Sequence, residues 1–184
     1  MGSYLKYFIV LSVTFLVIGY LFRNKGEYVK SDIDSNYYLV KGNNPIERAN
    51  ILARINIKIL GTFRILEPEI NGVYGKNIKN LMENYKGPGV LKESFDNTTY
   101  VLNKGQEISI CLENFKNEND LFFVVLHELA HLGCFEYGHG TEFVNFFKFL
   151  LEKAIKSNQY SYVNYKTSPT EYCDILINST PFVM

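Results

Sequence analysis

The sequence predicts an α+β fold, in which one domain with a small mixed sheet packed on helices is preceded by one transmembrane helix. The helix is predicted by an apolar segment at residues 4–22. The domain is predicted by segments of helical spacing that alternate with short segments of strand-like alternation. A hydrophobic content of 47% gives this length of chain enough apolar side chains for a core. We therefore divide the chain into an anchor at 4–22, a juxtamembrane linker at 23–44 and a domain at 45–184.

The N-terminal segment, YLKYFIVLSVTFLVIGYLF, has Lys6 as its one charged residue. A helix of this length spans about 28 Å, close to the thickness of the bilayer core. Basic residues follow the segment, so the positive-inside rule predicts a single-pass membrane protein with its domain in the cytosol. A cleaved signal peptide is the alternative, but no small-residue cleavage site follows. A buried helix is disfavoured because the segment is apolar on every face.

The elements of the domain follow from local signals. Residues 37–40 form a short strand-like segment within the linker. A first helix should begin at Pro45 after Asn44, and Gly61 should fall near its end. The remaining expectations are a helix at 77–85, a hairpin of 98–102 and 107–112 around the turn 103–106, helices at 118–132 and 141–157, and short strands after 159.

Charge and cysteine content exclude some classes of protein. The 19 basic and 19 acidic residues cancel, so electrostatics gives no reason to expect a nucleic-acid partner. The three cysteines, Cys111, Cys134 and Cys173, are few and widely spaced. Such a set does not resemble a disulfide framework, and we expect the domain to fold without oxidation.

A metal site is predicted by the three histidines of the chain, which all lie between residues 127 and 139. His127, Glu128 and His131 form an HExxH motif, which on a helix places both imidazoles on one face. A catalytic zinc takes three protein ligands and keeps one open position. Gly133 should end the helix, and His139, between two glycines, is the expected third ligand.

Other residues near the motif compete for roles at the metal. Glu136 and Glu142 are alternative third ligands, because carboxylates also complete HExxH sites. Cys134 could approach the ion, although a small buried residue after the helix is the expected role. If none of these residues converges, the histidines are instead satisfied core residues, which would leave Glu128 buried without a partner.

The expected chemistry is hydrolysis of a peptide bond in a polypeptide substrate. One zinc ion activates a water molecule, and Glu128 takes its proton and returns it to the leaving amine. A strand at 107–112 could pair with an extended peptide, which makes Ile108 and Ile110 candidate substrate-binding residues unless the strand is interior. Tyr137, Tyr165 and Tyr172 are candidates for stabilising the oxyanion.

The stretch HELAHLGCFEYGHGTEF, residues 127–143, resembles the active site of the WLM and SprT-like zinc metallopeptidases. In these families a short loop and a Gly-His element follow HExxH, as Gly138 and His139 do here. Residues 104–112 resemble the WLM strand that precedes the site helix, and residues 169–173 resemble the tail of WLM-like proteins of large DNA viruses and their relatives. The resemblance implies a zincin fold, endopeptidase activity, one zinc and the three-histidine set. A DNA-repair role is not implied, because the chain lacks a basic surplus.

Three functions are compatible with these patterns. A membrane-anchored zinc endopeptidase is the leading hypothesis. A catalytically silent scaffold or binding protein with a structural zinc is the alternative, and the intact Glu128 argues against it. A zinc hydrolase acting on non-peptide substrates is the third, and a cleft long enough for a peptide would argue against that one.

Overall fold

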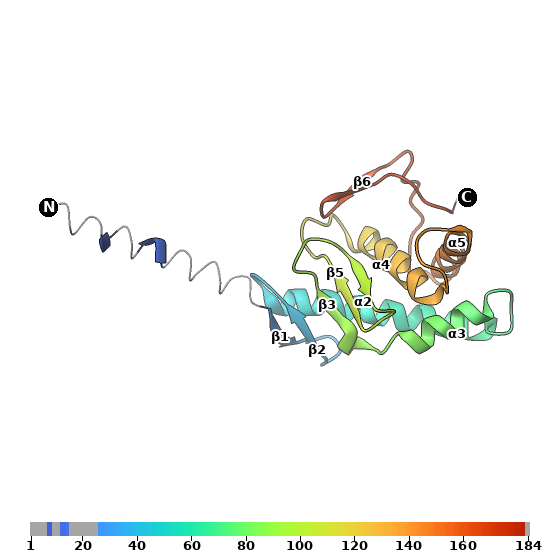
Figure 1. Ribbon diagram of the computed structural model, residues 1–184, viewed down its shortest axis with the longest axis horizontal. Coiled ribbons are helices and arrows are strands. Elements are labelled where there is room, and N and C mark those ends of the chain that lie inside the picture. The colour runs from blue at the N-terminus through green and yellow to red at the C-terminus, as the bar shows by residue number, and fades with distance from the viewer. Residues whose placement is uncertain (1–6, 9–11, 15–25, 183–184) are drawn as a thin grey trace.

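The computed structural model describes residues 7–8, 12–14 and 26–182 (Figure 1). Its main sheet has five strands in the order β1-β2-β3-β5-β4. The pairs β1–β2 and β4–β5 are antiparallel, whereas β2–β3 and β3–β5 are parallel, so the sheet is mixed. The strands are β1 (Glu27–Lys30), β2 (Tyr37–Val40), β3 (Leu91–Glu93), β4 (Tyr100–Leu102) and β5 (Glu107–Ile110). The prediction of an α+β domain with a small mixed sheet is confirmed.

Residues 26–182 also form four helices, which pack on the sheet or on one another. They are α2 (Pro45–Leu66), α3 (Gly75–Asn84), α4 (Glu118–Gly133) and α5 (Thr141–Lys156), with short 3-10 turns η1 (Glu67–Glu69) and η2 (Pro88–Val90). Helix α2 packs on β1, β2 and β3, whereas α4 packs between α3, α5 and β4. Helix α2 begins at Pro45, as predicted, but continues past Gly61 because Thr62 and Leu66 extend its buried face.

The linker predicted at 23–44 contributes to the domain. Residues 27–40 form the β1–β2 hairpin at one edge of the sheet, and Tyr38 and Val40 are completely buried. The sequence of this segment is polar because only alternate positions of the edge hairpin face the core. The hairpin therefore covers part of α2 as a structural element of the domain.

The predicted membrane anchor requires a correction. Across residues 7–8, 12–14 and 26–182, no helix combines the length and the apolar composition that crossing a bilayer demands. Helix α2 has 22 residues but carries Arg48, Arg54 and Lys58, and the more apolar α4 has 16, fewer than the roughly 20 that span a bilayer. The expectations of a preceding transmembrane helix and of a single-pass membrane protein are not supported. Most of the 4–22 segment lies outside the described residues.

The role predicted for Ile108 and Ile110 is also corrected. Strand β5 lies inside the sheet, between β3 and β4, and both isoleucines are buried in the core. Their backbone groups pair with the neighbouring strands, so they are not available to a substrate. The edge of the sheet on this side is β4.

A second, two-stranded sheet near the C-terminus joins β6 (Thr170–Tyr172) to β7 (Ile175–Ile177). It is linked to the residue that follows β5 by a disulfide between Cys111 and Cys173. The cysteines were not expected to form a disulfide framework, and this one pairing was not predicted. The two residues are 62 positions apart in sequence, and only the fold reveals that their Cα atoms lie 6.5 Å apart.

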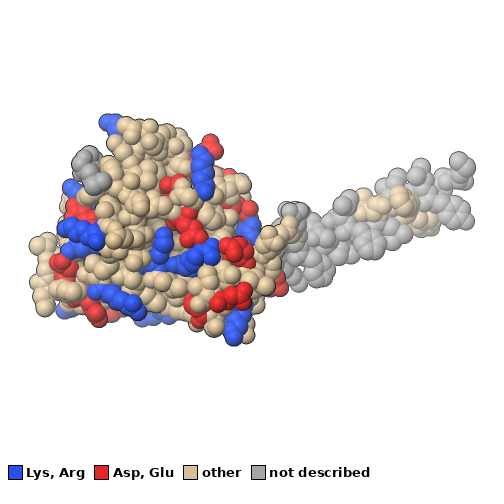
Figure 2. Space-filling view, turned by 180° about the vertical axis from the view of Figure 1, so that it is seen from behind, with Lys and Arg blue, Asp and Glu red and all other residues tan. Residues whose placement is uncertain are grey.

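On the face that is hidden in Figure 1, basic and acidic residues do not form separate patches. Figure 2 shows basic and acidic side chains interspersed over this face. Mixing of this kind agrees with the cancelling charges of the sequence and gives no field of a single sign there.

Candidate metal centre

Helix α4 presents the HExxH motif. Its N-cap residue Asn117 accepts a hydrogen bond from the backbone of Asp120, which fixes the start of the helix. Most of α4 is buried, so its direction is set by the core. The rings of His127 and His131 lie on the same face with their centroids 4.9 Å apart. The motif therefore projects two imidazoles from a rigid element.

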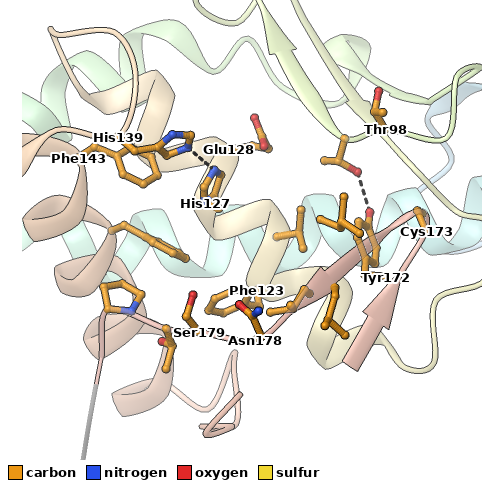
Figure 3. A pocket seen from close by; sticks show the side chains of 18 of the residues that line it. Thr98, Phe123, His127, Glu128, His139, Phe143, Tyr172, Cys173, Asn178 and Ser179 are labelled. Carbon is orange, nitrogen blue, oxygen red and sulfur yellow. Dashed lines mark hydrogen bonds between the residues drawn. The ribbon is translucent and has the colours of Figure 1, made fainter. Parts of the chain in front are cut away.

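His139 reaches the same point from the loop between α4 and α5. The preceding Gly138 has φ +87°, a conformation that L side chains rarely adopt, and this turn directs the loop back to the helix. The Nε2 atom of His139 lies 3.0 Å from that of His127 and 3.2 Å from that of His131. Figure 3 shows the rings of His127 and His139 facing each other, with Glu128 beside them. The three histidines converge as predicted.

The three nitrogens fit a tetrahedral metal ion. Ligand atoms of the three residues all lie within 4.8 Å of one another. Zinc–nitrogen bonds of about 2.0–2.1 Å in a tetrahedron place the nitrogens about 3.3 Å apart, close to the two distances given above. Three imidazoles leave one position of a tetrahedral ion open. The donor set thus matches a catalytic rather than a closed structural site.

The electrostatics of the site keep two of the imidazoles neutral. Burial, together with the neighbouring His131 and His139, lowers the pKa of His127 to about 3. Burial, with His139 and Lys104, lowers the pKa of His131 to about 4. Neutral imidazole is the form that binds metal ions. At neutral pH these lone pairs are therefore available without displacement of a proton.

Phe143, at the start of α5, supports the three imidazoles. Its ring stacks on that of His131 at a centroid distance of 4.3 Å, and it meets the rings of His127 and His139 edge-on at 4.8 and 4.7 Å. Phe143 is almost completely buried. The contact restricts each ring to one orientation, a function that the sequence pattern alone did not assign.

The loop that carries His139 is held by Glu142. One carboxylate oxygen accepts hydrogen bonds from the backbone of Phe135 and from the amide of Asn77, and the other accepts from the backbone of Glu136. Partial burial opposes ionisation, but these hydrogen bonds prevail and lower the pKa of Glu142. Glu142 thus fixes the loop instead of binding the ion, and neither it nor Glu136 belongs to the converging group.

The C-terminal end of α4 is capped by a row of asparagines on α3. Asn77, Asn80 and Asn84 donate to the carbonyl oxygens of Leu132 and Gly133. Lys104 donates to the carbonyl of Cys134. These bonds satisfy carbonyl groups that the end of a helix leaves without partners.

Cys134 is buried, and burial raises the pKa of its thiol to about 12, so the thiolate form needed for metal binding is disfavoured.

Glu128 lies beside the histidines in a buried position, with 7% of its surface exposed. Burial raises the pKa of its carboxyl group to about 8, although a hydrogen bond with the backbone of Val101 opposes the rise. The group therefore lies between the metal centre and the edge strand β4. A carboxyl group tuned toward neutral pH suits proton transfer.

Two cavities meet at this centre. One, of about 700 Å³, lies on the side of the β6–β7 hairpin, and the other, of about 530 Å³, lies beside Lys104 and Tyr137. Thr99, His127, Glu128 and His139 line both cavities. The centre is thus placed along a cleft that continues in two directions.

The three tyrosines considered as oxyanion stabilisers have different environments. Tyr165 is buried and donates to Asp120, away from both cavities. The hydroxyl of Tyr172 donates to the carbonyl of Cys111 and contacts Thr99, so its proton is already used. Tyr137 is 88% exposed and lines the smaller cavity next to His139. Of the three, only Tyr137 is exposed beside His139, and its ring contacts the ammonium group of Lys104.

Part of this site was missed at the level of sequence. The asparagines of α3 carry a visible signal, because Asn77, Asn80 and Asn84 are spaced to share one face of a helix. The larger cavity is also lined by residues 175–181. Their sequence gives no such signal, because only the folding of the β6–β7 hairpin onto α4 and α5 brings them to the site.

Comparisons with known proteins give relatives in a mimivirus and in invertebrate iridescent viruses. The chain is 33% identical over 166 residues to "Uncharacterized protein R325" of Acanthamoeba polyphaga mimivirus. This alignment covers 85% of this chain and 84% of the mimivirus protein. The chain is 40% identical over 63 residues to "Uncharacterized protein 136R" of Invertebrate iridescent virus 6, covering 30% of this chain and 35% of the relative. No protein-family model matches the chain. No solved structure is significantly similar to it.

Proposed function

The chain belongs to the family of the mimivirus protein R325, and we propose that it is a zinc-dependent endopeptidase of the WLM and SprT-like kind. The observation that carries the proposal is the convergence of three imidazole nitrogens beside a buried carboxyl group. Three neutral nitrogen donors with one open position are the arrangement that hydrolytic zinc sites use. A structural site would require a fourth protein ligand, and the converging group among the described residues has three.

His127, His131 and His139 would hold the ion. A bound zinc ion would supply Lewis acidity and positive charge, which polarise a water molecule and the scissile carbonyl and favour the ionised form of Glu128. Phe143 keeps the imidazoles oriented, and Glu142 keeps His139 in place. These supports preorganise the donor set before the ion binds.

Glu128 is the group that moves the proton. As a carboxylate it accepts a proton from the attacking water, whose oxygen forms the new bond to the carbonyl carbon. The same carboxyl group then donates that proton to the amide nitrogen as the C–N bond breaks. Its burial beside β4 keeps bulk water from competing for this transfer.

Strand β4 provides a surface for an extended substrate. It is an edge strand that pairs with β5 on one side only, and Thr99, Tyr100 and Val101 line the cavity next to the histidines. A polypeptide can add to such an edge through backbone hydrogen bonds. This favours a peptide over a small non-peptide substrate.

The test is digestion of an unstructured protein, such as casein, by the zinc-loaded chain and by Glu128→Gln. We expect the variant to bind one zinc per chain and to lose activity by about 10²–10⁴-fold, the usual contribution of a general base. Glu83→Gln, on the exposed surface of α3, is the matched control and should retain full activity. Equal proteolysis by wild type and Glu128→Gln would reject the mechanism.

A further inference from the structure

The larger cavity lies directly against the proposed catalytic centre. It is lined by residues of α4 and α5, by residues 97–99 and by the C-terminal segment that runs through the β6–β7 hairpin to Pro181. Figure 3 shows His139 and Phe143 at one end of it with His127 beside them, Tyr172 and Cys173 at the opposite end, and Asn178 and Ser179 along the side between. A group held here is therefore next to the atoms that react.

The lining of this cavity is largely apolar. Helix α4 contributes Phe123 and Val124, helix α5 contributes Val144 and Phe147, and β7 contributes Ile177. Glu128 is the one acidic or basic residue, apart from the histidines, among those that line it. A charged side chain placed here would lose its hydration without gaining a partner, which is costly.

The wall formed by the C-terminal segment is fixed to the rest of the domain. Cys173, at the turn between β6 and β7, is linked by its disulfide to Cys111. Tyr172 donates to the carbonyl of Cys111 at 2.8 Å, and its hydroxyl lies 2.7 Å from that of Thr99. The cavity is thus a preformed feature of the domain, as expected for a site that selects its ligand.

We propose that this cavity is the specificity pocket of the peptidase and that it takes a large apolar side chain, aromatic or leucine-like, next to the scissile bond. The inference rests on the proposed function, since it assigns one side of that catalytic centre. A volume of about 700 Å³ leaves room for side chains far larger than alanine. Apolar pockets distinguish one methylene by roughly 10–200-fold, so we expect phenylalanine to exceed alanine by at least 10²-fold in kcat/KM.

The first measurement uses the zinc-loaded full chain and synthetic peptides blocked at both ends. Cleavage positions are mapped by mass spectrometry, and the residues on both sides of the cut bond are then varied one at a time among Phe, Leu, Ala, Lys and Glu. We expect one of the two positions to favour Phe and Leu over Ala, and to reject Lys and Glu. Cleavage at equal rates for all five residues at both positions would overturn the proposal.

The second measurement changes the pocket itself. Val144 is 42% exposed on α5, so an arginine at this position can reach the cavity without disrupting the core. Val144→Arg should lower the preference for Phe over Glu by at least tenfold. Val73→Arg, at a 94% exposed position outside both cavities, is the matched control and should leave the preference unchanged.

Binding separates this proposal from the proposed activity. The zinc-loaded Glu128→Gln variant is titrated with the same peptides, and the ratio of Kd for Ala and Phe peptides is measured. If wild type cleaves nothing but this ratio exceeds tenfold and falls in Glu128→Gln/Val144→Arg, the pocket stands and the endopeptidase proposal fails. If cleavage occurs without a preference, the endopeptidase stands and the pocket proposal fails. No cleavage with a ratio near one would reject both.

Discussion

At the scale of single residues, the environment of Glu128 combines two opposing requirements. The carboxyl group is buried, and burial raises its pKa to about 8, so the metal-free protein holds it in the neutral form at pH 7. Proton transfer from water requires the ionised form, which the positive charge of a bound ion would favour. We therefore expect the ionised form of Glu128, which proton transfer requires, to predominate at pH 7 only when a metal ion is bound.

This tuning predicts a pH-dependent effect of Glu128→Gln on the stability of the metal-free protein. The unfolded carboxyl ionises near its ordinary pKa of 4.5, whereas the folded one does so near 8, so folding is penalised as pH rises between these values. Glutamine removes the penalty. In EDTA we expect equal Tm values for both proteins at pH 4 and a Tm higher by at least about 3 °C for the variant at pH 8.

The comparison is made by thermal unfolding followed by circular dichroism at several pH values. Glu83→Gln, at an exposed position, controls for the loss of one negative charge and should show no such pH dependence. A Tm difference between wild type and Glu128→Gln that stays constant from pH 4 to pH 8 would contradict the argument.

Glu142 gives a second prediction at this scale, on metal affinity. Glu142→Ala removes the acceptor of two backbone N–H groups and of Asn77, so the loop that carries His139 loses its fixed position. Residues that orient metal ligands typically contribute 10–100-fold to affinity, and we expect zinc binding to weaken by that amount. Competition titration with a chromophoric chelator measures the change. Glu136→Ala, on the same loop but without a side-chain bond to it, should bind zinc like wild type, and equal affinities for all three proteins would reject this role.

At the scale of elements, one disulfide joins the β6–β7 hairpin covalently to the end of β5, in addition to the hydrogen bonds of Tyr172. The disulfide closes a loop of 62 residues, and removing a bond of this kind costs about 2–5 kcal/mol. We expect reduction by dithiothreitol to lower Tm and also to weaken the preference for apolar side chains, because the hairpin forms a wall of the larger cavity. Cys111→Ser/Cys173→Ser should behave like reduced wild type and should not respond to the reductant. A wild-type Tm that is unaffected by reductant would show that the link contributes nothing.

The same elements show which features can be predicted from sequence. The HExxH helix and α5 follow from apolar spacing, and the β4–β5 hairpin follows from its turn, because these signals are local. The order of strands is not local. Segment 107–112 has the alternation of an edge strand, but β3, from residues 91–93, pairs beside it and makes β5 interior. The Cys111–Cys173 link was missed for the same reason, since its partners meet only in the folded chain.

In the site, too, some features follow from local sequence signals and others depend on long-range packing. His127, Glu128 and His131 are fixed relative to one another by helical geometry, and the glycines around His139 indicate a return of the chain. The contact of Phe143 with all three rings and the clamp formed by Glu142 depend on how α5 packs on α4. The three converging histidines could thus be named from sequence, whereas the roles of Phe143 and Glu142 in positioning them could not.

At the scale of the whole molecule, the cleft continues past the metal centre on both sides. The apolar cavity lies toward the C-terminal segment, and the smaller cavity lies toward Lys104 and Tyr137. The ammonium group of Lys104 lies 4.7 Å from the centre of the Tyr137 ring, and Lys104 and Glu136 give this second side charges of both signs. Thr99, the residue that precedes the edge strand β4, lines both cavities and lies between the two sides.

A cleft that is open in both directions predicts cleavage of internal bonds. An exopeptidase must hold a free terminal charge beside the metal, and it needs a wall that stops the substrate there. Here Glu128 is the only charged side chain that lines the apolar cavity, and the smaller cavity carries charges of both signs in Lys104 and Glu136. The edge strand β4, whose Val101 backbone forms a hydrogen bond with Glu128, borders the smaller cavity. We therefore expect a peptide acetylated at its N-terminus and amidated at its C-terminus to be cleaved within about twofold of the rate of the free peptide. Chromatography of matched 12-residue peptides, blocked at neither, one or both ends, measures the rates. A loss of cleavage on blocking one end would identify that end as the site of recognition and would contradict an open cleft.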